Sequence, residues 1–225
     1  MPRQLNKFIL LSLILSFYAP TALAAGALAI SPPPFTVQAP LAEWSDSRQQ
    51  DGCEEASALM AIWAVRGKTA LSKAEAKKQL LAISDFEKKK YGEYRDVSLA
   101  DMKAWIFKDY FKYDQIEIKE KVTLDDLKAE VKAGHLILAP MNGRALKNPH
   151  FKAPGPERHM VLIYAYDAKK KEFITNDPGT RYGAGYRYPE KVLYQAIRAY
   201  STGYHKPIKQ VEKSVLVVTG RSVKK

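Results

Sequence analysis

The chain passes from a loop into a helix within the stretch QQDGCEEAS, residues 49–57. After it, apolar residues recur at three- and four-residue spacing until Gly67, which is the pattern of a helix about four turns long. Asp51 or Gly52 would cap this helix, and Cys53 would then lie in its first turn. Unpaired backbone N–H groups and the positive end of the helix dipole favour a thiolate at such a position. The stretch therefore predicts a cysteine nucleophile at a helix N-terminus.

The N-terminal residues have the composition of a secretory signal. A basic start, with Arg3 and Lys7, precedes a short apolar run, and Ala22-Leu23-Ala24 has the small-x-small pattern of a cleavage site. We therefore expect residues 1–24 to be a signal peptide and the mature protein to begin at Ala25. The expected location is secreted, periplasmic or cell-envelope, with no integral membrane span left after cleavage.

Cys53 is the only cysteine among 225 residues, so it cannot form an intramolecular disulfide. Exported proteins usually keep their cysteines as disulfides, and a lone thiol therefore requires another explanation. Nucleophilic catalysis is the leading one. The alternative is a small buried hydrophobic residue, which is common for free cysteines.

Length and composition indicate one folded domain. The chain is 46% hydrophobic, which is enough for one sizeable core. Residues 25–34 are rich in Ala and Pro and are expected to form an extended lead-in to a domain over 35–225.

The formal net charge is +12, and +10 once the two basic residues of the signal are removed. No zinc-finger spacing, RNA-binding signature or aromatic-basic stripe accompanies this charge, which argues against a nucleic-acid partner. An anionic cell envelope or an acidic peptide is the more natural setting. Metal-ligand spacings such as His-x-His or Cys-x-x-Cys are absent from the sequence, so we expect no metal and no other cofactor.

Helices are predicted mainly in the first half of the chain and strands in the second. Three more helices are indicated by a hydroxyl residue followed three positions later by a carboxylate: Ser72 with Glu75, Ser98 with Asp101, and Thr123 with Asp126. Short apolar runs predict strands over 135–139, 160–166, 172–176 and 215–219. The polar turn over 167–171 should join the second and third runs as an antiparallel hairpin. This segregation predicts an α+β fold.

A nucleophilic thiol needs a base, and the candidates are His135, His150, His159 and His205. His159 stands where a turn-rich loop enters the longest predicted strand, and loop-to-sheet edges commonly carry functional side chains. The other three are expected to be surface or structurally satisfied histidines.

The base in turn needs an acid to orient it. Asp177 ends the strand that pairs back on the one beginning at His159, so hairpin geometry returns it to the level of that histidine. Alternatively, it only starts the turn before Pro178-Gly179. Asn176 points to the opposite face and is the weaker candidate.

The order of Cys53, His159 and Asp177 resembles that of the papain-like cysteine peptidases. More closely, residues 52–57 with Met60, then 158–162, then 176–180 resemble the bacteriocin-processing, double-glycine-leader peptidase family and its stand-alone relatives. The resemblance covers roughly residue 35 to the end. It implies a papain-like fold and a catalytic role for the three residues. Unlike transporter-linked members, this sequence has no membrane-spanning or phosphate-loop ATPase segments, so leader cleavage during export is not implied.

The same resemblance implies an oxyanion-hole glutamine upstream of the cysteine. Gln38 lies in a strand-like segment of the kind that carries it, and Gln50 is the alternative, although both Gln49 and Gln50 are unusually close to Cys53. An insert over residues 41–50, with Trp44, is expected to form a loop that covers the site. The second oxyanion donor would be the backbone N–H of Cys53.

Together these features predict an exported thiol hydrolase that cleaves peptide or isopeptide bonds, with a peptide or protein of the cell envelope as a possible partner. Two alternatives stay open, namely transglutaminase-like acyl transfer to an amine and a non-catalytic cell-surface binding module on the same scaffold. Four tyrosines after Asp177 could line a groove or could be ordinary packing: Tyr182, Tyr186, Tyr188 and Tyr194.

Overall fold

The sheet at the centre of the molecule has six antiparallel strands. The computed structural model describes residues 31–69 and 71–220, and the strands lie in the order β1-β6-β2-β3-β4-β5. They are β1 (Ile116–Lys119), β2 (Leu136–Met141), β3 (His159–Asp167), β4 (Glu172–Asn176), β5 (Tyr186–Pro189) and β6 (Val215–Val218). Every residue of β2 and β6 is buried, which explains why these strands are continuous apolar runs in the sequence rather than alternating ones.

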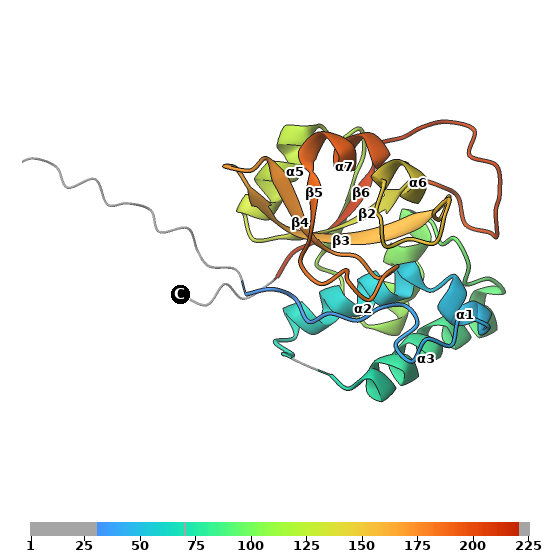
Figure 1. Ribbon diagram of the computed structural model, residues 1–225. Coiled ribbons are helices and arrows are strands. Elements are labelled where there is room, and N and C mark those ends of the chain that lie inside the picture. Colours follow the sequence, from blue (N-terminus) through green and yellow to red (C-terminus); the bar gives the residue numbers. More distant parts are fainter. Residues whose placement is uncertain (1–30, 70, 221–225) are drawn as a thin grey trace, which may run out of the picture.

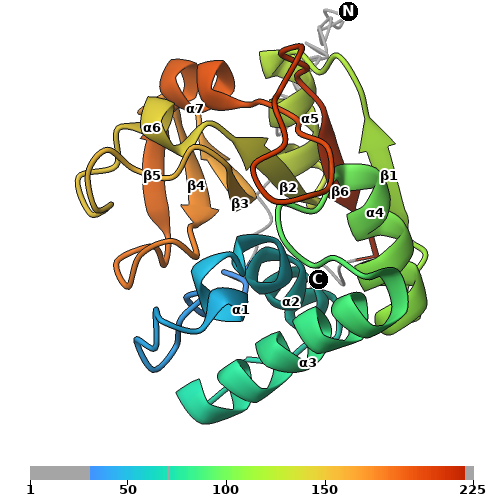
Figure 2. The same ribbon diagram turned by 90° about the vertical axis from the view of Figure 1, so that its right-hand side faces the viewer.

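Helices cover both faces of this sheet. Figures 1 and 2 show α2 against one face, with α3 on the far side of α2, and α5 and α7 against the other face. The helical elements are α1 (Ser47–Gln50), α2 (Cys53–Val65), α3 (Lys73–Tyr91), α4 (Leu99–Asp101), the π-helix η1 (Met102–Tyr110), α5 (Leu124–Lys132), α6 (Gly143–Leu146) and α7 (Glu190–Ala196). The site described below lies at the end of the sheet where α2 begins.

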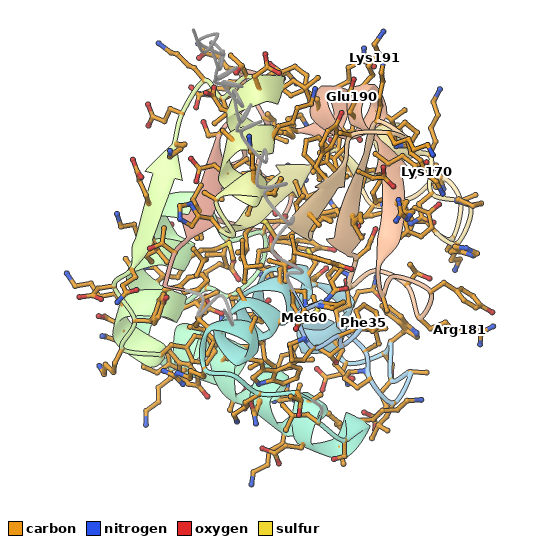
Figure 3. All side chains as sticks on the ribbon, turned by 90° about the vertical axis from the view of Figure 1, so that its left-hand side faces the viewer. Phe35, Met60, Lys170, Arg181, Glu190 and Lys191 are labelled. Atoms are coloured by element: carbon orange, nitrogen blue, oxygen red, sulfur yellow. The ribbon has the colours of Figure 1, made fainter. Side chains whose placement is uncertain are left out.

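Two hydrophobic cores result, one on each face of the sheet. Successive side chains of a strand point to opposite faces, and β3 follows this rule. Met160 and Leu162 join the core under α2, whereas Val161 and Ile163 join the core under α5 and α7. In Figure 3, Met60 of α2 lies inside the molecule, while Lys170, Arg181 and Lys191 project from its periphery.

The helix α2 is enclosed by the rest of the protein. All its residues from Cys53 to Trp63 are buried, and Ser57 Oγ donates a hydrogen bond to the Met160 carbonyl of β3 over 3.3 Å. Glu54 and Glu55 are buried along with the apolar residues, which is costly for carboxylates unless they are hydrogen-bonded or protonated. The first turn of α2 thus places two carboxyl groups inside a hydrophobic core.

The helix starts follow the predicted caps. Ser72 accepts a hydrogen bond from the Glu75 amide at the start of α3, and Ser98 accepts one from Asp101 at the start of α4. Thr123 and Asp126 form a complete capping box on α5. These contacts satisfy amides that have no partner within the helix.

The predicted α+β class is confirmed, and the four predicted strands correspond to β2, β3, β4 and β6 within a few residues. The elements missed from the sequence are β1, β5, the short helices α1, α6 and α7, and the π-helical form of η1. The two missed strands are only four residues long, and β5 is partly exposed, so neither makes the apolar run on which the prediction depended.

The end of the Ala/Pro-rich lead-in packs against the domain. Pro33 and Pro34 are buried, and the Asn176 side-chain amide donates to their carbonyls at 3.1 and 3.4 Å. The expected signal peptide and the cleavage site before Ala25 lie outside the described residues. Within 31–69 and 71–220, no helix has the length and apolar character needed to cross a membrane.

Candidate active site

Cys53 is positioned by a tight entry into α2. Gly52 is the N-cap, and a Cβ at this position would lie 2.4 Å from the Arg48 carbonyl oxygen of α1. Only glycine fits such an approach, so α1 and α2 can follow each other directly. The thiol is then fixed at the first turn of α2, with the residue 7% exposed.

The hairpin of β3 and β4 brings His159 and Asp177 together. The strands pair in antiparallel register, with Leu162 opposite Asn176 and an irregularity between Ile163 and Ala165. At the open end of the hairpin, His159 Nε2 lies 2.7 Å from Asp177 Oδ1. The pairing expected from the hairpin is therefore present, and both side chains are buried.

Asp177 accepts further hydrogen bonds that sequence reasoning did not find. Its Oδ2 accepts one from the Tyr188 hydroxyl at 2.6 Å, and Asn148 Nδ2 donates to that hydroxyl at 2.7 Å. The Gly179 amide donates to Oδ1 at 2.9 Å. Tyr188 is thus packed in the core rather than lining the cleft, and its hydroxyl also binds Asp177. No sequence signal distinguished it from Tyr186 two residues earlier.

These contacts keep Asp177 ionised. Burial alone would raise its pKa, but the charge of His159 and hydrogen bonds from His159, Tyr188 and Gly179 hold the pKa below its ordinary value. An ionised carboxylate only accepts hydrogen bonds, so His159 carries its proton on Nε2. The free Nδ1 of a neutral His159 ring is then the basic nitrogen.

The thiol lies next to this pair. Burial raises the pKa of the Cys53 thiol, and the backbone of Met160, one residue after His159, lies close enough to lower it in part. Cys53 and His159 line one cleft of about 750 Å³. Asp177 stands behind His159, away from the cleft. Gly179 also lines the cleft, and a Cβ there would lie 2.8 Å from His159 Cε1.

The rest of the cleft wall comes from the insert before α2 and from the loops around β3. Trp44 of the insert lines the cleft with 42% of its surface exposed. The insert is only in part the expected loop, because its residues 47–50 form α1. The remaining lining residues include Gln38, Gln50, Asp51, Asp96, Arg144, His150, Phe151, Lys152, Arg158, Tyr204 and His205.

Both glutamine candidates reach the cleft, but they differ in their contacts. Gln38 is buried, its Nε2 donates to the Gln49 and Gln50 carbonyls at 3.1 and 2.8 Å, and its backbone amide donates to Pro178. Gln50 is exposed. Gln38 is therefore the better-held side chain, although donation to an oxyanion would require one of its two hydrogen bonds to be exchanged.

The protonation state of the thiol differs from the expectation based on the helix N-terminus. Burial, followed by the negative charge of Glu54, raises the pKa of Cys53 well above its ordinary value. Cys53 Sγ donates a hydrogen bond to Glu54 Oε2 at 3.1 Å. The helix dipole acts on this thiol, but desolvation and an adjacent carboxylate outweigh it.

The other polar candidates occupy different places. His135 is paired with Glu130 of α5 at 2.7 Å, whereas His150 and His205 lie at the cleft rim. Asn176 faces away from His159, as expected, and holds the lead-in and the Gly185 amide. Within the described residues, no group of three or more His, Cys, Asp or Glu side chains could hold a metal ion.

Comparison with known proteins identifies the family and the fold. The model of the Peptidase_C39 like family matches residues 34–214, which is most of the chain. The chain belongs to this family. Its helices and antiparallel sheet are those of a papain-like C39 peptidase, and the resemblance inferred from the sequence is confirmed.

A solved structure supports the same fold. It is a crystal structure of a candidate C39-like peptidase from Bacillus anthracis, which superposes with a TM-score of 0.50 at 14% sequence identity. The match covers 87% of this chain and 97% of that one. No curated protein matched this sequence.

Proposed function

We propose that this protein is an exported thiol hydrolase that cleaves peptide or isopeptide bonds through an acyl-enzyme. The observation that carries the proposal is the buried contact of His159 with Asp177 at 2.7 Å, in the cleft that also contains the thiol of Cys53. Family membership supports a function of the cysteine-peptidase type. The assignment of roles to individual residues is part of the proposal.

In the proposed reaction, the Cys53 thiol gives its proton to His159 Nδ1 as sulfur attacks the substrate carbonyl. The carbon–nitrogen bond then breaks, and His159 returns the proton to the leaving amine. Water adds to the thioester in the same way and releases the acid. Asp177 holds the imidazole in the required tautomer and stabilises its cation, while the Cys53 amide and Gln38 would stabilise the oxyanion.

The substrate is proposed to be a peptide or protein chain, and the site of action the cell envelope or the exterior. The basic charge of the mature chain supports an anionic setting, and the start of the sequence supports export.

The test is labelling of the native protein with a thiol-directed activity probe, with and without prior alkylation. We expect Cys53→Ala to abolish labelling and His159→Ala to slow it strongly. His135→Ala is the matched control, because His135 also begins a strand region but pairs with Glu130 outside the cleft. If Cys53 reacts only after denaturation, the proposal is wrong and the chain is a binding module.

Mass spectrometry of peptide products, with and without an added primary amine, then separates hydrolysis from acyl transfer. Free acids as the main products support the hydrolase. Amide products that dominate at low amine concentration would assign the transferase alternative instead.

A further inference from the structure

A buried chain of hydrogen bonds connects Cys53 to Glu54 and Tyr200, which do not line the cleft. The Tyr200 hydroxyl donates to Glu54 Oε1 at 2.6 Å, and Cys53 Sγ donates to Glu54 Oε2 at 3.1 Å. Glu54 is 1% exposed and Tyr200 is 7% exposed. The thiol proton that the proposed reaction must transfer to His159 is therefore directed at a different acceptor, one that a Cys-His-Asp mechanism does not use.

The surroundings of Glu54 are acidic on several sides. The titratable groups that act on it or contact it are Cys53 and Glu55 of α2, Glu87 of α3, Asp96 before α4, and Tyr200 after α7. Arg158 approaches this group through Asp96, at 3.7 Å, and the His205 backbone amide also donates to Asp96. Glu54 itself forms no ion pair within the described residues, so its charge is held by hydrogen bonds alone.

This setting makes protonation of Glu54 accessible near neutral pH. Burial raises the pKa of Glu54 to about 7, against the hydrogen bonds from Tyr200 and Cys53, which lower it. An ionised carboxylate can only accept the S–H proton. A protonated one retains the hydrogen bond from Tyr200 on Oε1 and can donate from Oε2 to a sulfur anion.

We propose that Glu54 is a positioning residue that controls the ionisation of Cys53. When ionised, it accepts the thiol proton and holds Cys53 as an unreactive thiol. When it has taken up a proton from solvent, it donates a hydrogen bond to sulfur and stabilises the thiolate formed when the thiol proton passes to His159. This inference deepens the proposed thiol-hydrolase function and rests on it.

Glu54 and Cys53 interact directly, so their protons are lost in macroscopic steps that belong to the pair and not to either group alone. In the wild type, the logarithm of the alkylation rate should rise with pH, level off above about pH 7, where Glu54 ionises, and rise again only at high pH. The level region appears because each proton lost from Glu54 makes the thiolate harder to form. A thiol beside a neutral residue would show one simple step.

The experiment measures iodoacetamide alkylation of folded protein across pH, which requires no turnover. Glu54→Gln keeps the size and the acceptor for Tyr200 but cannot ionise. We expect it to remove the level region and to speed alkylation at about pH 8 by at least tenfold, the effect of a coupling greater than one pH unit. Tyr200→Phe removes a donor to the carboxylate, so we expect the level region to begin at higher pH.

Two controls identify the source of the effect. Glu55→Gln removes an equally buried acid that makes no hydrogen bond to sulfur, and it should shift the profile less than Glu54→Gln does. His159→Ala should retain the level region, since Glu54 is still present. Loss of the level region in His159→Ala but not in Glu54→Gln would overturn the proposal, as would unchanged profiles in both Glu54→Gln and Tyr200→Phe.

The result of the alkylation experiment can be distinguished from the result of the peptidase test. Profiles that change as expected in a protein that cleaves no peptide would reject the hydrolase while retaining the role of Glu54. Peptide cleavage together with unchanged alkylation profiles would retain the hydrolase and reject the role of Glu54. If Glu54→Gln fails to fold, Tyr200→Phe still decides the matter, because its shift has a defined direction.

Discussion

The burial of Glu54 predicts how the stability of the protein depends on pH. The pKa of this carboxyl is raised from an ordinary value of 4.5 to about 7, mainly by burial. Below about pH 4.5 the group is protonated in both the folded and the unfolded chain, and its contribution to stability is complete. As pH rises, the unfolded chain loses the proton first, so the free energy of unfolding falls until the folded group ionises near pH 7.

The magnitude follows from the same values. A difference of one pH unit between folded and unfolded pKa corresponds to about 1.4 kcal/mol, so Glu54 costs the wild type about 3 kcal/mol of stability between about pH 4.5 and pH 8. Glutamine does not titrate. We therefore expect Glu54→Gln to gain about 3 kcal/mol relative to the wild type over this range, whatever the effect of the substitution at low pH.

The assay is urea unfolding of wild type and variant at several pH values, with circular dichroism as the signal. Glu93→Gln provides a control of opposite sign. Although burial raises the pKa of Glu93, hydrogen bonds from Arg95 and from the Tyr94 and Arg95 amides lower it to about 2. Glu93 thus stabilises the protein above about pH 4.5, and its removal should cost stability at neutral pH. Parallel curves for wild type and Glu54→Gln would refute the reasoning, because Glu54 would then ionise alike in both states.

Other predictions concern the candidate site and the N-terminus. Asp177→Ala should lower turnover at least tenfold with the fold intact, since His159 loses the acceptor that fixes its tautomer; circular dichroism and steady-state kinetics check this. Tyr188→Phe should give a smaller loss in the same assay, because Asp177 retains the His159 and Gly179 contacts. Gln38→Ala should cost roughly 10²-fold in turnover and Gln50→Ala little, and the reverse ranking would assign the oxyanion role to Gln50. N-terminal sequencing of exported protein should begin at Ala25, and retention of Met1 would contradict the signal peptide.

Two further buried acids near Glu54 should also lower the stability of the protein as pH rises. Burial raises the pKa of Glu55 of α2 and of Glu87 of α3 well above their ordinary values, and the negative charges of Glu54 and Glu55 respectively raise them further. Ser84 donates to Glu55 Oε1 at 2.9 Å. The wild type should therefore lose more stability with rising pH than Glu54 alone accounts for, and part of that loss should persist in Glu54→Gln.

Much of the candidate site was readable from local sequence. Gly52 and the apolar repeat after it are contiguous, so they fix Cys53 in a first helical turn regardless of what packs around it. The turn over 167–171 and the two apolar runs beside it likewise determine a hairpin, and the hairpin pairs His159 with Asp177. Both inferences depend on short-range geometry, in which neighbours in sequence are also neighbours in space.

Only the tertiary structure decided the chemical environment of those residues. Tyr200 reaches Glu54 across 146 residues of sequence, and Asn148 and Tyr188 lie 40 residues apart. A helix N-terminus predicts a low thiol pKa, yet the enclosure of α2 and the charge on Glu54 raise it instead. The local sequence pattern determines which helix or strand carries a residue and the position of the residue in that element. Its protonation depends on desolvation, which only the fold produces. Even the charge of Glu54, the sequence neighbour of Cys53, depends on burial and on Tyr200, which the tertiary structure brings close.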